Sequence, residues 1–81
     1  MAQHPRQTIG LKIREIRRAR GLSQQAFADE LGVDRTYIGS LERGERNLTL
    51  DTVVALAERL RIDVLELLVP PSRARGTTGQ R

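Results

Sequence analysis

Apolar residues recur along the first part of the chain at the three- and four-residue spacing of amphipathic helices. Thr8 is expected to cap a first helix that ends at Gly21, and Ser23 to cap a second helix that ends at Gly32. Glycine suits the last position because a helix often ends there in a left-handed conformation. The inward-facing positions are expected to be Ile9, Ile13, Ile16, Phe27, Ala28 and Leu31.

The same spacing predicts three more helices. Asp34 is expected to cap a third helix over about 35–43, Thr49 a fourth, and Asp63 a short fifth that a proline pair ends. The inward-facing positions are expected to be Ile38 and Leu41 in the third helix and Leu50, Val53, Val54, Ala57 and Leu60 in the fourth, with Leu56 off that face. Since no strand pattern or repeat occurs, the fold class is predicted to be all-α, with very short links between helices.

The charge is unevenly placed along the chain. The formal net charge is +4, yet between positions 8 and 69 ten Lys and Arg balance ten Asp and Glu. The excess lies in 1–7, expected to be a flexible arm, and in 70–81, expected to be a disordered basic tail because it has almost no apolar content. Residues 8–69 are predicted to form one domain, and bulk charge alone does not indicate its partner.

Several functional classes are excluded by residues that the sequence lacks. There is no cysteine and only one histidine, His4, so no metal site and no cofactor are expected. No glycine-rich phosphate loop and no nucleophile with a partner base occurs, so the chain is not expected to be an enzyme. The start lacks a signal peptide and the longest apolar run, VVALA, cannot span a bilayer, which predicts a cytoplasmic protein with no membrane partner.

The spacing within residues 24–41 predicts a helix-turn-helix. Ala28 offers the small side chain that two crossing helices require, Gly32 the tight turn, and Ile38 an apolar anchor for the second helix. The second helix of this motif enters the major groove of DNA with its N-terminal residues at the base edges. The positions expected to face outward are Arg35, Thr36, Tyr37, Gly39 and Ser40.

A family resemblance extends this prediction over about residues 9–68. The segment resembles Cro/C1-type (XRE-like) helix-turn-helix regulators in the run IGLKIREIRRARGLSQQAFADELGVDRTYIGSLERGERNLTLDTVVALAERLRID. More narrowly, DRTYI followed by ERGERNLTL is similar to the controller proteins of restriction–modification systems. Phe27 and Leu50 depart from the usual leucine and proline. The resemblance implies a compact, five-helix, lambda-repressor-like DNA-binding domain.

Three residues of the third helix are candidate base contacts. Arg35, at its start, could bind O6 and N7 of a guanine with both arms of its guanidinium group. Thr36 could contact a base edge or a thymine methyl group, and Ser40 could reach a base if the helix lies deep in the groove. The alternative for Arg35 is a surface arginine paired with Glu30 or Glu42, and the alternative for Thr36 is a residue that merely suits an exposed helical site.

Contacts with the DNA backbone are expected around this helix. Gln24 resembles the family's phosphate-contacting glutamine, with Ser23 beside it, and the free amides of the second helix would add to that contact. Tyr37 could contact a phosphate or sugar, or else pack over the turn. By family analogy the loop after the third helix also meets the backbone, through Arg43, Arg46 and Asn47; the alternative is a polar loop without a partner.

Two sets of residues are expected to serve the fold and the assembly. The family places an ion pair between the first and third helices at Arg17 and Glu42. Leu56, Leu65 and Leu68 are the candidate dimer contacts, although Leu68 could instead complete the core of the monomer. A chain of this length buries a small core, which favours self-association.

The predicted function is that of a DNA-binding transcriptional regulator, which is expected to be nucleoid-associated. One short helix reads few base pairs, so a homodimer on a two-fold symmetric operator in double-stranded DNA is expected, with RNA polymerase or another protein as a possible further partner. The alternative is an antitoxin-like or adaptor module whose main partner is a protein. The two differ in salt dependence, because phosphate contacts weaken steeply as salt is added.

Overall fold

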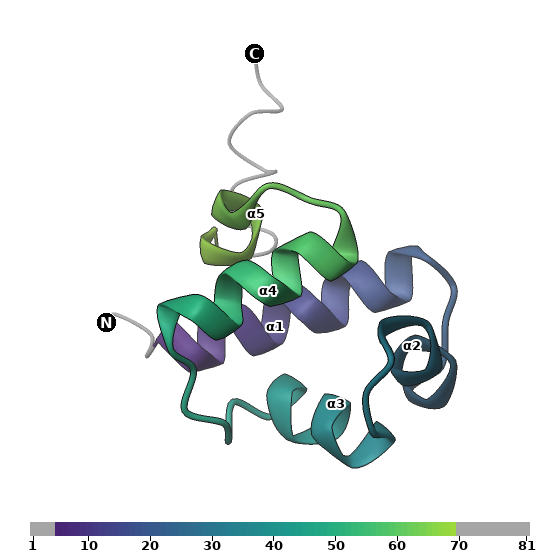
Figure 1. Cartoon of the computed structure of the whole chain (residues 1–81). Helices are drawn as coiled ribbons and strands as arrows, with labels where there is room; N and C mark the ends of the chain where they lie inside the picture. The colour runs from purple at the N-terminus through teal and green to yellow at the C-terminus, as the bar shows by residue number, and fades with distance from the viewer. Residues whose placement is uncertain (1–4, 70–81) are drawn as a thin grey trace, which may run out of the picture.

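The computed structural model describes residues 5–69, which form five α-helices and, within that range, no strand (Figure 1). The helices are α1 (Pro5–Ala19), α2 (Gln24–Leu31), α3 (Arg35–Glu42), α4 (Leu50–Leu60) and α5 (Val64–Leu68). The predicted all-α class and helix order are confirmed. The predictions for residues 1–4 of the expected arm and for the whole of the expected tail, 70–81, lie outside the described residues.

The first helix begins earlier than the sequence predicted. Thr8 was expected to cap it, but α1 begins at Pro5 and Thr8 lies inside its first turns. Proline is well suited to the first turn of a helix, because its φ angle is already helical and its missing N–H would have no partner there. Residues 5–7 therefore belong to α1, whereas they were expected to belong to the arm.

Side chains cap three of the helices as predicted. The Ser23 hydroxyl accepts a hydrogen bond from the amide of Ala26, that of Thr49 from Thr52, and the Asp63 carboxylate from Leu65, at 3.0, 3.2 and 3.0 Å. Asp34 occupies the cap position of α3 with extended backbone, but its side chain makes no capping hydrogen bond. Gly32 ends α2 in the left-handed conformation that the sequence indicated, at φ 72° and ψ 32°.

One core unites the helices, and α4 contributes to it through a different face from the one predicted. Leu50 and Val54 were expected to be inside but are 73% and 38% exposed, whereas Leu56 was expected to be off the core face and is only 4% exposed. The observed stripe follows i, i+3, i+4 and i+7 spacing from Val53, which is the helical repeat. The core consists of Ile9, Ile13, Phe27, Ala28, Leu31, Ile38, Leu41, Val53, Leu56, Ala57, Leu60 and Leu67.

A glycine lets α1 approach the end of α3 closely. Gly10 is buried, and a Cβ atom placed on it would lie 2.2 Å from the carbonyl oxygen of Leu41 and 3.0 Å from that of Glu42. Both atoms are backbone and have no freedom to rotate away. Any side chain at this position would therefore push α1 and α3 apart.

Arginine side chains bind the carbonyl ends of two helices. Arg20, just after α1, donates to the carbonyl oxygen of Leu60 at 2.8 Å, and Arg59 of α4 donates to the carbonyl oxygen of Leu31. These carbonyls belong to the last turns of α4 and α2, where helices leave acceptors without internal partners. The C-terminal ends of α1, α4 and α2 are thereby joined in series.

Within the described range, no helix is long and apolar enough to cross a membrane.

Candidate nucleic-acid interface

The first turn of α3 presents the residues predicted to read bases. Arg35 and Thr36 are exposed, whereas Ile38 and Leu41 on the opposite face are buried in the core. α2 and α3 lie together at one side of the molecule, away from α5 (Figure 1). This arrangement anchors α3 from beneath and leaves its N-terminal side chains directed to solvent, as a recognition helix requires.

Gly39 differs from the outward position that the sequence indicated for it. It is buried, and a Cβ atom there would lie 3.1 Å from Nη1 of Arg43 and 4.0 Å from Oε1 of Gln24. Long polar side chains therefore cover this part of α3. Only the ends of flexible side chains surround Gly39, in contrast to the backbone atoms that face Gly10.

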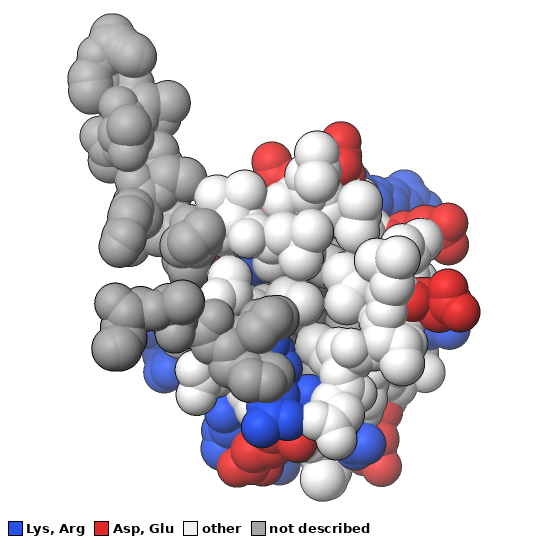
Figure 2. All heavy atoms as spheres, turned by 90° about the vertical axis from the view of Figure 1, so that its left-hand side faces the viewer, with Lys and Arg blue, Asp and Glu red and all other residues white. Residues whose placement is uncertain are grey.

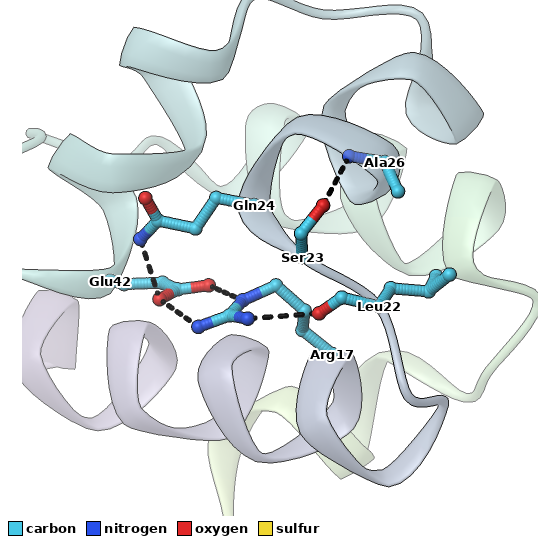
Figure 3. A network of polar contacts seen from close by, with 6 residues as sticks. All are labelled: Arg17, Leu22, Ser23, Gln24, Ala26 and Glu42. Atoms are coloured by element: carbon cyan, nitrogen blue, oxygen red, sulfur yellow. Dashed lines mark hydrogen bonds and ion pairs between the residues drawn. The ribbon is translucent and has the colours of Figure 1, made fainter.

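A polar network ties α1, α2 and α3 together behind this surface (Figure 3). Arg17 donates from Nε to Oε2 of Glu42 at 2.6 Å and from Nη2 to Oε1 at 3.1 Å, which is a two-armed ion pair. Its third donor, Nη1, reaches the carbonyl oxygen of Leu22 at 2.9 Å. The ion pair predicted from the family resemblance is thus present, and it fixes the end of α3 against α1 and the α1–α2 link.

The ionisation of Glu42 is governed by the same contacts. Burial by itself raises the pKa of its carboxyl group, but hydrogen bonds from Arg17 and Gln24 and the charge of Arg17 outweigh burial and lower the pKa below its usual value. The pKa of Arg17 is raised, chiefly by its hydrogen bond to Glu42. The side chains are only 12% and 5% exposed, so the charges attract each other with little screening by water.

Gln24 belongs to this network as well as to the start of α2. Its Nε2 donates to Oε1 of Glu42 at 3.1 Å, a contact that the sequence did not reveal (Figure 3). An amide nitrogen carries two hydrogens, so one N–H remains for another acceptor. Ser23 accepts from Ala26 as the cap, which leaves its hydroxyl hydrogen available. Both residues therefore retain a donor at the positive end of a helix.

The loop after α3 folds back onto α3 itself. Arg46 donates from Nε to the Ser40 hydroxyl at 2.9 Å, and its guanidinium carbon lies 4.7 Å from the ring centre of Tyr37. Ser40 in turn donates to the carbonyl oxygen of Tyr37 at 2.9 Å. The Tyr37 side chain is half-buried against the core. Arg46, Ser40 and Tyr37 form one cluster, which we call the Arg46 cluster.

The other two predicted loop contacts have partners of their own. Arg43 donates from Nε to Oε2 of Glu45 at 3.0 Å, in an exposed ion pair that raises the pKa of Arg43 and lowers that of Glu45. Asn47 accepts a hydrogen bond from Arg6 of α1 through Oδ1. The Asn47 side chain therefore keeps its own N–H groups for other acceptors.

Apolar side chains gather at the end of the molecule where α1 and α4 begin. Figure 2 shows this end, with a broad uncharged area and charged side chains mainly at its edge. A hollow of about 370 Å³ here is lined by Ile9, Leu48, Leu50, Val53 and Leu68 together with polar residues. Leu65 and Leu68 are 63% and 47% exposed, as a dimer contact requires, whereas Leu56 is buried inside the chain. Sequence reasoning missed Leu50, which it placed in the core.

Known proteins are similar to this chain in sequence and in architecture. The model of the helix-turn-helix family HTH_3 matches residues 13–67. The chain is 43% identical over 63 residues to control protein C.SmaI of Serratia marcescens, covering 78% of this chain and 75% of that one. It is 36% identical over 69 residues to control protein C.BamHI of Bacillus amyloliquefaciens, covering 84% and 85%.

Solved structures agree. The restriction–modification controller protein C.AhdI from Aeromonas hydrophila is 44% identical, with a TM-score of 0.65, covering 76% of this chain and 94% of that one. A hypothetical transcription factor from Neisseria is 31% identical, with a TM-score of 0.76, covering 93% and 86%. These relatives are regulators and not enzymes, and the resemblance predicted from the sequence is confirmed. The chain therefore belongs to the helix-turn-helix family HTH_3 of DNA-binding transcriptional regulators.

Proposed function

We propose that this protein binds a two-fold symmetric DNA operator as a homodimer, with α3 of each copy in the major groove. The observation that carries the proposal is the exposed first turn of α3, held in place from behind by the core and by the Arg17–Glu42 ion pair. A recognition helix needs this combination, because base reading demands that its side chains be accessible while its backbone does not shift.

Arg35 is the residue best suited to select a base pair. Its side chain is exposed at the first position of α3, and a guanidinium group can donate two parallel hydrogen bonds to a guanine. Thr36 beside it is also exposed and can contact a thymine methyl group. Ser40 is less available, because its hydroxyl hydrogen is already donated to Tyr37.

Backbone contacts are proposed on both flanks of α3. On one flank, Ser23 and Gln24 retain hydrogen-bond donors at the N-terminus of α2, where the helix dipole favours a phosphate. On the other, Arg43, Arg46 and Asn47 follow α3 directly. Two sets of donors on either side of a recognition helix would fix its register between the two walls of the groove.

The proposed dimer contact is the apolar end of the molecule, through Leu50, Leu65 and Leu68. These leucines are well exposed, and Leu50 and Leu68 line the same hollow. Exposed apolar groups at one place on a small protein commonly mark an interface. Leu56 is not included, because its burial within the chain leaves it little surface to offer a partner.

Selection of bound sequences from a random duplex library tests the operator and the role of α3. The wild type is expected to enrich an inverted repeat, with half-sites roughly 34 Å or a multiple of that apart. Arg35→Ala should lose about 1 to 3 kcal/mol per contacted guanine and relax the preference there. The charge-matched control is Arg61→Asn, because Arg61 lies in the α4–α5 link on the other side from α3 and asparagine tolerates its left-handed backbone (Figure 1). An unchanged ranking of sites in Arg35→Ala would refute base reading by this residue.

Sedimentation of the double variant Leu50→Ser with Leu65→Ser tests the dimer contact. The wild type should sediment as a dimer at micromolar concentration and the variant as a monomer that retains its helical circular dichroism. Ala55→Ser is the control, since Ala55 is exposed on α4 but lines a separate hollow with Val33 and Tyr37. A wild type that stays monomeric both free and on operator DNA would exclude the proposed assembly.

A further inference from the structure

The Arg46 cluster places a fully charged guanidinium group beside the recognition helix without neutralising it. Arg46 follows α3 and lies on it through two contacts, the hydrogen bond from Nε to Ser40 and the stacking on Tyr37. Neither partner carries a charge. Arg43, three residues before Arg46, is instead paired with the carboxylate of Glu45 at 3.0 Å. Of these two arginines, Arg46 keeps its positive charge available for an incoming anion.

The hydroxyl of Ser40 is occupied in both directions. Its hydrogen is donated to the carbonyl oxygen of Tyr37, and one lone pair accepts the N–H of Arg46. A serine hydroxyl has a single hydrogen, so Ser40 has none to donate to a base unless this arrangement opens. The cation–π contact with the ring face of Tyr37 also holds the guanidinium group, and this contact does not require the tyrosine hydroxyl.

We propose that Ser40 and Tyr37 are positioning residues, which hold Arg46 in place for the phosphate contact proposed above. The proposal rests on the proposed function, since it takes α3 to lie in the groove. Arg46 uses Nε for Ser40, which leaves the two terminal nitrogens of its guanidinium group to donate to a phosphate oxygen. An exposed arginine loses rotamer freedom when it binds, and an arginine already held in place loses less.

The placement can be tested without DNA. In the free protein, the {¹H}–¹⁵N nuclear Overhauser effect of the Arg46 Nε–Hε group should show an ordered side chain, whereas Arg35, exposed at the start of α3, should be mobile. Ser40→Ala and Tyr37→Leu should make Arg46 as mobile as Arg35, and Tyr37→Phe should leave it ordered. An Arg46 that is as mobile as Arg35 in the wild type would overturn the proposed positioning.

The role in binding is tested by a double-mutant cycle on two duplexes, the selected operator and a scrambled sequence. Arg46→Ala should weaken both and lower the salt slope by about one, the contribution of one phosphate contact. With Arg46 present, Ser40→Ala should weaken binding roughly two- to tenfold, the range of one hydrogen bond. In the Arg46→Ala background, Ser40→Ala should not weaken binding further. A Ser40→Ala effect that persists without Arg46 would show that Ser40 contacts DNA itself and would overturn the proposal.

The two duplexes separate failure of this proposal from failure of the proposed function. Equal affinity of the wild type for both duplexes would refute operator recognition, while a cycle measured on the scrambled duplex would still report whether Arg46 binds phosphate. Arg61→Asn again controls for the loss of one positive charge and should change both affinities less than Arg46→Ala does. An equal loss in the two variants would reduce Arg46 to bulk charge and overturn the phosphate contact.

Discussion

The substitution Gly10→Ala tests the close approach of α1 to the end of α3. A Cβ atom there would lie 2.2 Å from the carbonyl oxygen of Leu41. Carbon and oxygen normally approach to about 3.3 Å, so the two helices would have to separate by roughly 1 Å. Extra atoms in a packed core cost about 1 to 3 kcal/mol, and we expect the upper end because the obstacle is backbone.

The helical preference of alanine offsets part of that cost. Alanine is favoured over glycine inside a helix by about 1 kcal/mol, which leaves a net loss of about 2 kcal/mol in the free energy of unfolding. For a domain of this size, such a loss corresponds to a fall in Tm of about 8 to 16 °C. The assay is thermal and urea unfolding followed by circular dichroism at a fixed protein concentration, since a dimer would make Tm depend on concentration.

Gly39→Ala is the matched control for this prediction. Gly39 is also a buried glycine within a helix, but its added Cβ atom would meet Nη1 of Arg43 at 3.1 Å, the end of a side chain that can move. We expect it to be neutral or to stabilise by up to about 1 kcal/mol. If Gly10→Ala were as stable as the wild type or gained stability as Gly39→Ala does, the close helix contact would be refuted.

Two further predictions concern charge and capping. The pKa of Glu42 is lowered in the folded state, so its contribution to stability is complete above the unfolded value near 4.5 and is lost as pH falls through the lower folded pKa. Glu42→Gln should therefore flatten the acid side of the curve of unfolding free energy against pH. At pH 7 it should cost about 3 kcal/mol, because Arg17 loses its charged partner. An acid side as steep as that of the wild type would contradict this prediction. Thr49→Ala should cost about 1 kcal/mol in urea unfolding through loss of its cap, and Asp34→Ala only a few tenths (about 0.3), since Asp34 makes no capping bond; equal losses would disprove the difference.

Local signals account for most of the fold that could be predicted from the sequence. Ser23, Gly32, Thr49 and Asp63 mark helix ends through contacts within a few residues, and such contacts depend little on the rest of the chain. The start of α1 was missed because Thr8 resembles a cap as much as those residues do. Only the structure shows that the helix extends back to Pro5.

The side of α4 that faces the core could not be settled by periodicity alone. Leu50, Val54 and Leu56 are all apolar. An apolar stripe with helical spacing can therefore include either Leu50 and Val54 or Leu56. Packing in the core that all five helices share selects Leu56. The rotation of a helix about its own axis is set by tertiary packing, and it decides which leucines stay exposed for contact with a partner.

The candidate site was predictable as a set of positions but not as a set of contacts. The helix-turn-helix spacing places Arg35 and Thr36 at the start of an exposed helix, and the family resemblance supplies Arg17 with Glu42. Neither source reveals that Gln24 donates to Glu42 or that Arg46 lies on Tyr37. These pairs depend on where a loop and a helix end meet in space, which no local pattern encodes.

The arginine contacts at the carbonyl ends of α2 and α4 have a consequence for hydrogen exchange. Last turns of helices usually open on their own, and their amides exchange by local fraying. Here Arg59 ties the end of α2 to α4, and Arg20 ties the end of α4 to the end of α1. The amides of Leu31 and Leu60 cannot then open one turn at a time without releasing a neighbouring helix. They should exchange with the slow, cooperative unit of the core, so that these three helix ends open as one body.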